Sequence, residues 1–144
     1  MITPSPTSPL QLQRIDHVVL RVRDLERSIA FYCAVLGCSV AKRRDDLGLV
    51  HLRAGDSMID LVALDGPTGQ KGGAGPADEG RNMDHLCLSY SNFSEAEVMA
   101  FLDSHRVQHG AKAQINFGAR GDGTSIYLAD PDENVVELKC YDAS

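Results

Sequence analysis

Two histidines stand in the same short phrase at two places in the chain. Asp16-His17 and Asp84-His85 each open a run in which apolar residues alternate with other residues. Such alternation is typical of a half-buried strand, so each imidazole would lie opposite a uniformly apolar face. Histidines that converge from two copies of one unit are typical ligands of a metal. The repeat therefore indicates a chemical site.

One carboxylate interrupts an apolar, strand-like run near the end of each half of the chain, Asp60 in the first and Glu137 in the second. An ionised carboxylate in a half-buried strand is costly unless it is paired or bound to a cation. We therefore expect one divalent metal per site (Ni, Zn, Co, Mn or Fe(II)), held by His17, His85, Glu137 and Asp60. For Asp60, the alternative is an edge-strand residue that faces water.

Arg21 shares the predicted face of His17. Its guanidinium could bind a substrate carboxylate, or it could form a salt bridge to a neighbouring strand. The remaining histidines are interpreted as ordinary surface residues; they are His51, His105 and His109.

The glycine-rich stretch 117–123 is either a flexible lid that carries Arg120 or a wide hairpin connection. Ser125 and Tyr127 follow it on one strand face and could supply hydroxyls to the substrate. For Tyr127, core packing is the alternative.

The elements that must position these residues follow one order twice. In the first unit the residue pattern predicts a strand over 15–22 and a helix that begins after Asp24 and ends at Gly37. Three further strands are predicted over 38–44, 48–53 and 57–64. The second unit predicts the same order, with a helix after Ser94 and strands over 83–90, 111–117, 124–129 and 135–141. The expected fold class is α+β, with two β-α-β-β-β modules, 14–64 and 83–141.

A linker and an arm complete the predicted organisation. Residues 65–82 are rich in glycine and proline, which is typical of a loop that joins the modules. Residues 1–13 contain three prolines and are interpreted as a mobile arm. Residues 14–144 then form a single domain. Pairing of the modules would give a curved, mixed eight-stranded sheet, an incomplete barrel around a central cavity.

The composition excludes several classes of partner. With a formal net charge of −6 and one short basic triplet, the chain is not expected to bind nucleic acid. No apolar run approaches the ~18 residues of a membrane-spanning helix, so no membrane partner is expected. Four cysteines without a CxxC pair favour reduced thiols and a cytoplasmic location.

With these residues in place, residues 14 to 141 resemble the vicinal oxygen chelate superfamily. This superfamily includes glyoxalase I, fosfomycin-resistance proteins, extradiol dioxygenases and bleomycin-resistance proteins. The most specific matches are the stretches 17–22, 24–32 and 35–37, and the segment from Asp130-Pro131-Asp132 through Glu137.

The resemblance implies metal ligands at His17, His85 and Glu137, with Asp60 where glyoxalase I has a glutamate that also serves as a catalytic base. It also implies a glutathione-carboxylate-binding role for Arg21, glutathione as a co-substrate, and a homodimer with sites near the subunit interface. Three-ligand members keep only the two histidines and one glutamate, and the chain could follow either pattern.

The expected function is a metal-dependent enzyme of glyoxalase type, with a lactoylglutathione lyase as the specific version. Its small substrate would chelate the metal through adjacent oxygens, and Glu137 or Asp60 would move a proton between carbons. Fosfomycin-type epoxide opening and Fe(II)-dependent ring cleavage are alternatives. A metal-free protein that sequesters a drug or metabolite is the alternative from another class.

Overall fold

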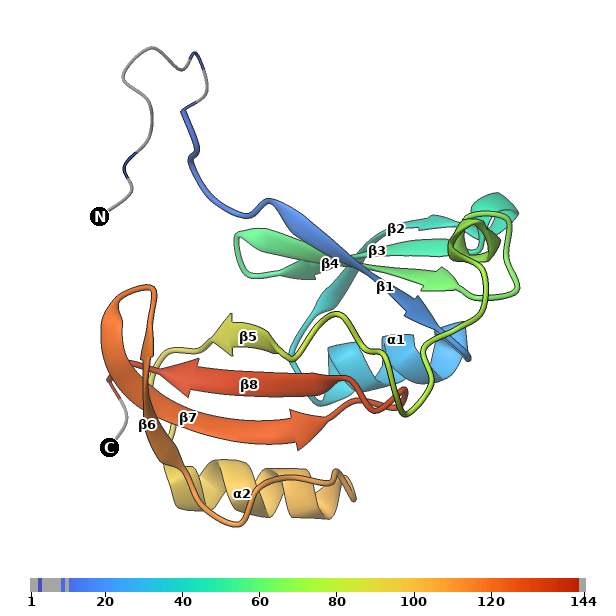
Figure 1. Cartoon of the computed structure of the whole chain (residues 1–144). Helices are drawn as coiled ribbons and strands as arrows, with labels where there is room; N and C mark the ends of the chain where they lie inside the picture. Colours follow the sequence, from blue (N-terminus) through green and yellow to red (C-terminus); the bar gives the residue numbers. More distant parts are fainter. Residues whose placement is uncertain (1–2, 4–8, 10, 143–144) are drawn as a thin grey trace.

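The computed structural model, which describes residues 3, 9 and 11–142, contains two successive β-α-β-β-β modules (Figure 1). The first module comprises β1 (His17–Val22), α1 (Leu25–Ala34), β2 (Ser39–Arg44), β3 (Leu49–Ala54) and β4 (Ser57–Ala63). The second comprises β5 (Leu86–Ser89), α2 (Glu95–Ser104), β6 (Gln114–Gly118), β7 (Gly121–Ala129) and β8 (Val135–Cys140). Short 3₁₀ helices follow β2 and β4, η1 (Asp45–Leu47) and η2 (Gly69–Gly72). The α+β class and both modules are confirmed, whereas most of the predicted arm lies outside the described residues.

The predicted helix boundaries follow from local chemistry. The side chain of Asp24 accepts a hydrogen bond from the backbone N–H of Arg27 at 3.0 Å, which caps the start of α1. Gly37 follows α1 with a φ of +79°, a left-handed conformation that favours glycine. The second helix starts after Ser94 as predicted, but the Ser94 side chain makes no capping hydrogen bond.

The eight strands form two four-stranded mixed sheets, ordered β1-β4-β3-β2 and β5-β8-β7-β6. In each module the first strand pairs in parallel with the last, and the other pairings are antiparallel. Within the described residues no strand pair joins the two sheets. The strands expected in one curved sheet are therefore divided between two sheets of identical order.

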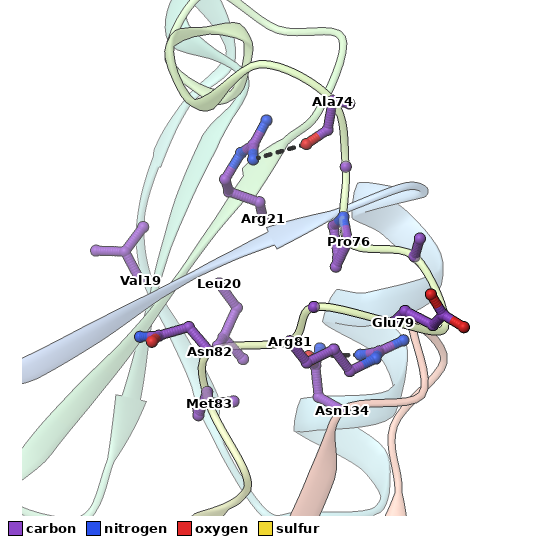
Figure 2. A pocket seen from close by; sticks show the side chains of 13 residues that line it. Val19, Leu20, Arg21, Ala74, Pro76, Glu79, Arg81, Asn82, Met83 and Asn134 are labelled. Carbon is purple, nitrogen blue, oxygen red and sulfur yellow. Dashed lines mark hydrogen bonds between the residues drawn. The ribbon is translucent and has the colours of Figure 1, made fainter.

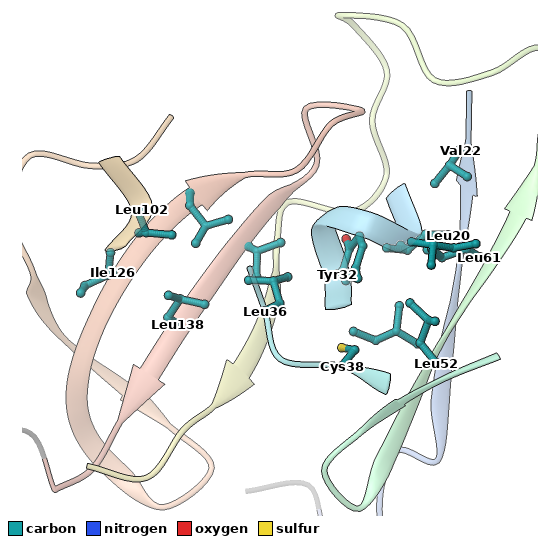
Figure 3. Packing of buried hydrophobic residues seen from close by; sticks show 14 of the residues in the cluster. Leu20, Val22, Tyr32, Leu36, Cys38, Leu52, Leu61, Leu102, Ile126 and Leu138 are labelled. Atoms are coloured by element: carbon teal, nitrogen blue, oxygen red, sulfur yellow. The ribbon is translucent and has the colours of Figure 1, made fainter. Parts of the chain in front are cut away.

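One hydrophobic core spans both modules. Leu20 and Leu61 of the first sheet and Ile126 and Leu138 of the second belong to the same buried cluster. In Figure 3, Tyr32 and Leu36 lie between the side chains of the two sheets. On β1, Leu20 and Val22 are buried while His17 and Val19 are exposed, so the predicted phase of the strand is confirmed.

The Asp130-Pro131-Asp132 turn fastens the second module to α1. The buried hydroxyl of Tyr32 donates a hydrogen bond to Asp130 Oδ2 at 2.8 Å, while the backbone N–H groups of Asp132 and Asn134 donate to Oδ1 at 2.9 and 2.8 Å. Burial, followed by the charge of Asp130, raises the pKa of Tyr32, so this hydroxyl stays a donor. The turn thus supplies a joint between the modules.

Replacement of Asp130 by Ala should lower the free energy of unfolding by about 3 kcal/mol, because several buried donors lose their acceptor at once. Urea denaturation checks this value, with the exposed Asp78→Ala as the matched control. Equal stability of the two variants would show that the joint does not hold the modules together.

Candidate metal centre

The first candidate half-site lies on the face of the first sheet that carries His17 and consists of His17, His51 and Asp60. His17 begins β1, and Asp60 occupies the middle of β4. Asp60 pairs with Val19 on one side and with His51 on the other. Side chains of directly paired residues point to the same face of a sheet, so His51 belongs beside Asp60.

The carboxylate of Asp60 is buried and turned toward β3. Its Oδ2 lies 2.9 Å from Nδ1 of His51, and the side chain is 9% exposed. Its Oδ1 is buried and has no hydrogen-bond partner among the described residues. The interpretation of His51 as an ordinary surface residue is wrong, since its ring contacts a predicted metal ligand. The water-facing alternative for Asp60 is also wrong.

The second candidate half-site consists of His85, Glu137, Ser125 and Lys139. His85 lies just before β5, and Nε2 of its ring is 3.0 Å from Oε2 of Glu137. The other carboxylate oxygen, Oε1, accepts a hydrogen bond from the Ser125 hydroxyl at 2.5 Å and lies 3.1 Å from Nζ of Lys139. Ser125 and Lys139 therefore hold Oε1 of Glu137, and Oε2 faces His85.

Lys139 is a buried cation with all of its donors engaged. Its side chain is 3% exposed, and Nζ donates to the Ser125 hydroxyl at 2.8 Å and to the carbonyl of Asn116 at 2.9 Å, in addition to the Glu137 contact. Burial raises the pKa of Glu137, but the hydrogen bonds from Ser125 and Lys139 and the Lys139 charge outweigh it and leave this pKa below its usual value. Glu137 is therefore an anion at neutral pH.

Both aspartates of the repeated phrase contact the histidine that follows them. Nδ1 of His17 lies 2.8 Å from Asp16, and Nδ1 of His85 lies 2.6 Å from Asp84. The hydrogen bond with Asp16 raises the pKa of His17. A carboxylate on one ring nitrogen fixes the tautomer, so that Nε2 is the nitrogen that could bind a metal. The sequence analysis assigned no role to these two aspartates.

Within one chain the two half-sites do not meet. No group of three or more His, Cys, Asp or Glu side chains in the described part of the chain could hold a metal. A cavity of about 450 Å³ lies between β1 and residues 74–83 (Figure 2), but none of the four predicted ligands lines it. The expected central cavity with all four ligands is therefore not formed by a single copy of the protein.

Arg21 contacts the linker rather than either of the partners expected for it. Its guanidinium donates to the carbonyls of Gly69 at 3.0 Å, Gly72 and Ala74 at 3.3 Å each, and Gly73, and Figure 2 shows the bond to Ala74. A Cβ at position 72 would lie 2.6 Å from this guanidinium, so a side chain there would displace Arg21 from its present position. In this conformation the cation of Arg21 holds the linker, and the predicted contact with a substrate carboxylate is not open to it.

The other predicted substrate-binding residues are also engaged within the protein. Arg120 lies over the ring of Tyr141, 4.7 Å from its centroid, in the two-residue turn between β6 and β7. Stretch 117–123 is thus a tight hairpin. Ser125 is fully buried and holds Glu137, whereas the hydroxyl of Tyr127 accepts from Asn116 at 3.0 Å. Ser125 and Tyr127 therefore both border predicted ligands, Ser125 through Glu137 and Tyr127 through His85, whose ring meets the Tyr127 ring edge to face at 5.6 Å.

The donor geometry of the second half-site fits a divalent metal. Two ligand atoms bound at about 2.1 Å and at a right angle to each other lie about 3.0 Å apart. His85 Nε2 and Glu137 Oε2 are separated by 3.0 Å. On the first half-site, a cation would satisfy the unpartnered Oδ1 of Asp60. Imidazole and carboxylate donors together suit Zn and other first-row metals.

Comparison with known proteins identifies the class that this fold and these half-sites define. The pattern of the glyoxalase/bleomycin resistance protein/dioxygenase superfamily matches residues 14–138. The chain belongs to this superfamily. Many of its members are enzymes, and metal dependence is common among them.

Individual relatives are distant and differ in activity. The chain is 29% identical to a lactoylglutathione lyase of Salmonella typhimurium over 136 residues, which cover 87% of this chain and 90% of the lyase. It is 27% identical to a catechol-2,3-dioxygenase of Bacillus subtilis over 86% of its own length but spans only 40% of that protein. The crystal structure of virulence protein STM3117 from Salmonella typhimurium superposes with a TM-score of 0.70 at 26% identity, covering 92% of this chain and 99% of that protein.

Proposed function

We propose that the protein is a divalent-metal-dependent enzyme of glyoxalase type, whose small substrate chelates the metal through two adjacent oxygens. The observation that carries the proposal is the 3.0 Å contact between Nε2 of His85 and Oε2 of a buried, ionised Glu137. A protein that only sequesters a ligand has no need of a histidine and a buried carboxylate on the same sheet face in each module. The metal, one of Ni, Zn, Co, Mn or Fe(II), would be held by His17, Asp60, His85 and Glu137.

The proposed active site is shared between two copies of the chain. Because the half-sites of one chain do not come together, the first half-site of one copy would face the second half-site of its partner in a homodimer. Exposed apolar side chains, Val19 beside the first half-site and Val135 beside the second, would be covered by such pairing. Nε2 of the half-exposed His17 would then complete the donor set.

The bound metal would polarise the two substrate oxygens and stabilise the negative charge that develops on them. The residues of the chain supply position and proton transfer. Ser125 and Lys139 hold Oε1 of Glu137, so Oε2 is the atom of this residue that would accept or return a proton. Asp60 is the second carboxylate that could move a proton between adjacent carbons of the substrate.

A lactoylglutathione lyase is the specific activity that we propose first, with glutathione as co-substrate, on the basis of the similarity to the Salmonella enzyme over 90% of that protein. Fosfomycin-type epoxide opening and Fe(II)-dependent ring cleavage are the competing reactions, the latter favoured by the similarity to the dioxygenase. We also propose a cytoplasmic location, on the basis of four cysteines without a CxxC pair. No helix in the described residues has the length and apolar character needed to cross a membrane.

Elemental analysis of the untagged protein tests the proposal. We expect about one metal ion per chain, and its loss in the His85→Ala variant. The matched control is His105→Ala, which removes a surface imidazole at the end of α2. Failure of the wild type to bind Ni, Zn, Mn or Fe(II) would contradict the metal-dependent function and favour a sequestering protein.

The lyase activity needs a separate assay. Metal-loaded protein should convert the methylglyoxal–glutathione adduct, and turnover should stop on addition of a chelator and return with metal. A protein that binds metal but does not turn over this adduct would exclude the lyase and leave the other two reactions.

A further inference from the structure

We propose that His51 is a positioning residue of the metal centre, which fixes Asp60 so that a single oxygen, Oδ1, becomes the carboxylate donor of the first module. The inference rests on the proposed function and adds to it a residue outside the four ligands. His51 itself does not bind the metal in this scheme.

The register of the first sheet places His51 where it can hold Asp60. Asp60 pairs directly with His51 on β3, whereas on β1 it pairs with Val19, and His17, two residues earlier, stands opposite Met58. The carboxylate is accordingly turned to β3, with Oδ2 at 2.9 Å from Nδ1 of His51. Oδ2 of Asp60 is thus held by β3, the neighbour of β4 on the side opposite to β1.

The other oxygen of Asp60 has no such contact. Oδ1 is buried and has no hydrogen-bond partner in the part of the chain that the structure describes. The residue as a whole is only 6% exposed, so solvent has little access to this oxygen. Nearly all buried polar atoms in proteins have a partner, and an unpartnered carboxylate oxygen is costly. A metal ion held in the completed site would supply the missing partner.

The second module shows the same division between its carboxylate oxygens. Oε1 of Glu137 is held by Ser125 and Lys139, and Oε2 is left beside His85. In both modules, therefore, one oxygen is fastened by neighbouring strand residues and the other is available. Two single-oxygen donors and two imidazoles occupy four positions of a six-coordinate ion, which leaves two for a substrate that binds through two oxygens.

Three substitutions of His51 separate positioning from direct metal binding. Asparagine places its amide nitrogen near the position of Nδ1, and glutamine places its amide nitrogen near that of Nε2. Alanine removes both. His105→Asn is the matched control at the end of α2. Thermal denaturation and gel filtration of each metal-free variant report its fold and assembly, and competition with a chromogenic chelator measures its Ni²⁺ affinity.

We expect His51→Ala and His51→Gln to weaken Ni²⁺ binding about 10- to 100-fold, as loss of residues that orient metal ligands commonly does. His51→Asn should stay within about threefold of the wild type, because the group that holds Oδ2 is restored. Unchanged affinity in His51→Ala, with the wild type binding Ni²⁺, would overturn this inference and leave the proposed function intact. Retention by glutamine with loss by asparagine would also overturn it, since His51 would then act through Nε2. If the wild type did not bind Ni²⁺, both the inference about His51 and the proposed function would be overturned.

Discussion

The Lys139→Met variant should lose about 3–5 kcal/mol of its free energy of unfolding, because it leaves the carboxylate of Glu137 buried without its cation. Lys139 and Glu137 are 3% and 5% exposed, with 3.1 Å between Nζ and Oε1, so water cannot replace the lost partner. Methionine keeps an unbranched side chain of similar shape, one atom shorter, and removes the charge and the donors. Chemical denaturation of the metal-free protein measures the loss, with Lys112→Met, an exposed lysine, as the matched control.

The double variant Glu137→Gln/Lys139→Met should recover most of this stability, because removal of both charges leaves no unpaired ion. The single Glu137→Gln variant should be destabilised like Lys139→Met, since it leaves Lys139 without its anion. If the three variants lost stability additively, the two charges would not be coupled, and the account of the second half-site would be wrong.

The same pair predicts the direction of a pH effect. The pKa of Glu137 lies below its usual value of about 4.3 in the folded protein, so its stabilising contribution is present at neutral pH and lost as the pH falls through the folded pKa. In Lys139→Met, burial acts without the opposing cation and raises this pKa. The stability deficit of the variant relative to the wild type should therefore shrink as the pH falls through the raised pKa, because protonation of Glu137 removes the unpaired charge, and chemical denaturation of both proteins at neutral and acidic pH measures the change.

The second large effect concerns the metal itself. The Glu137→Gln/Lys139→Met protein should fold but bind Ni²⁺ at least about 100-fold more weakly than the wild type, because loss of a ligand should cost no less than loss of a residue that orients one. A neutral amide cannot replace the charge of Oε2 beside His85. Chelator competition on the folded variant, beside Lys112→Met, gives the value. Wild-type affinity in the double variant would show that Glu137 is not a ligand.

Strand alternation made much of the site predictable. The period of two placed His17, Val19 and Arg21 on one face of β1 and Leu20 and Val22 on the other, and the structure confirms this division. The repeat of the Asp-His phrase likewise predicted two modules of equal element order. These signals are local, since each depends only on residues a few positions apart.

Contacts between strands distant in the sequence were not predictable in the same way. His51 belongs beside Asp60 only because β3 and β4 pair in one particular register, and a shift of one residue would point it to the other face. The linker contacts of Arg21 depend in turn on how residues 69–74 fold over β1.

The position of Lys139 could be predicted from the sequence only in part. Alternation places it on the face of Glu137, but its burial depends on packing under the β6–β7 hairpin. A side chain at Gly118 would lie 2.6 Å from the Tyr141 hydroxyl and 3.0 Å from the Lys139 side chain, so the glycine leaves room for the buried lysine. The glycine-rich stretch that suggested a lid thus serves the packing of a charged residue behind the site.

The most direct test of a metal centre shared between two chains is to mix two inactive variants. His17→Ala and His85→Ala should each bind almost no Ni²⁺ alone. After the two are unfolded, mixed in equal amounts and refolded, half of the dimers should be mixed, and each mixed dimer should hold one intact site. About a quarter of the wild-type Ni²⁺ binding should therefore return. No recovery in dimers shown to have exchanged their chains would contradict a site built from half-sites of two copies.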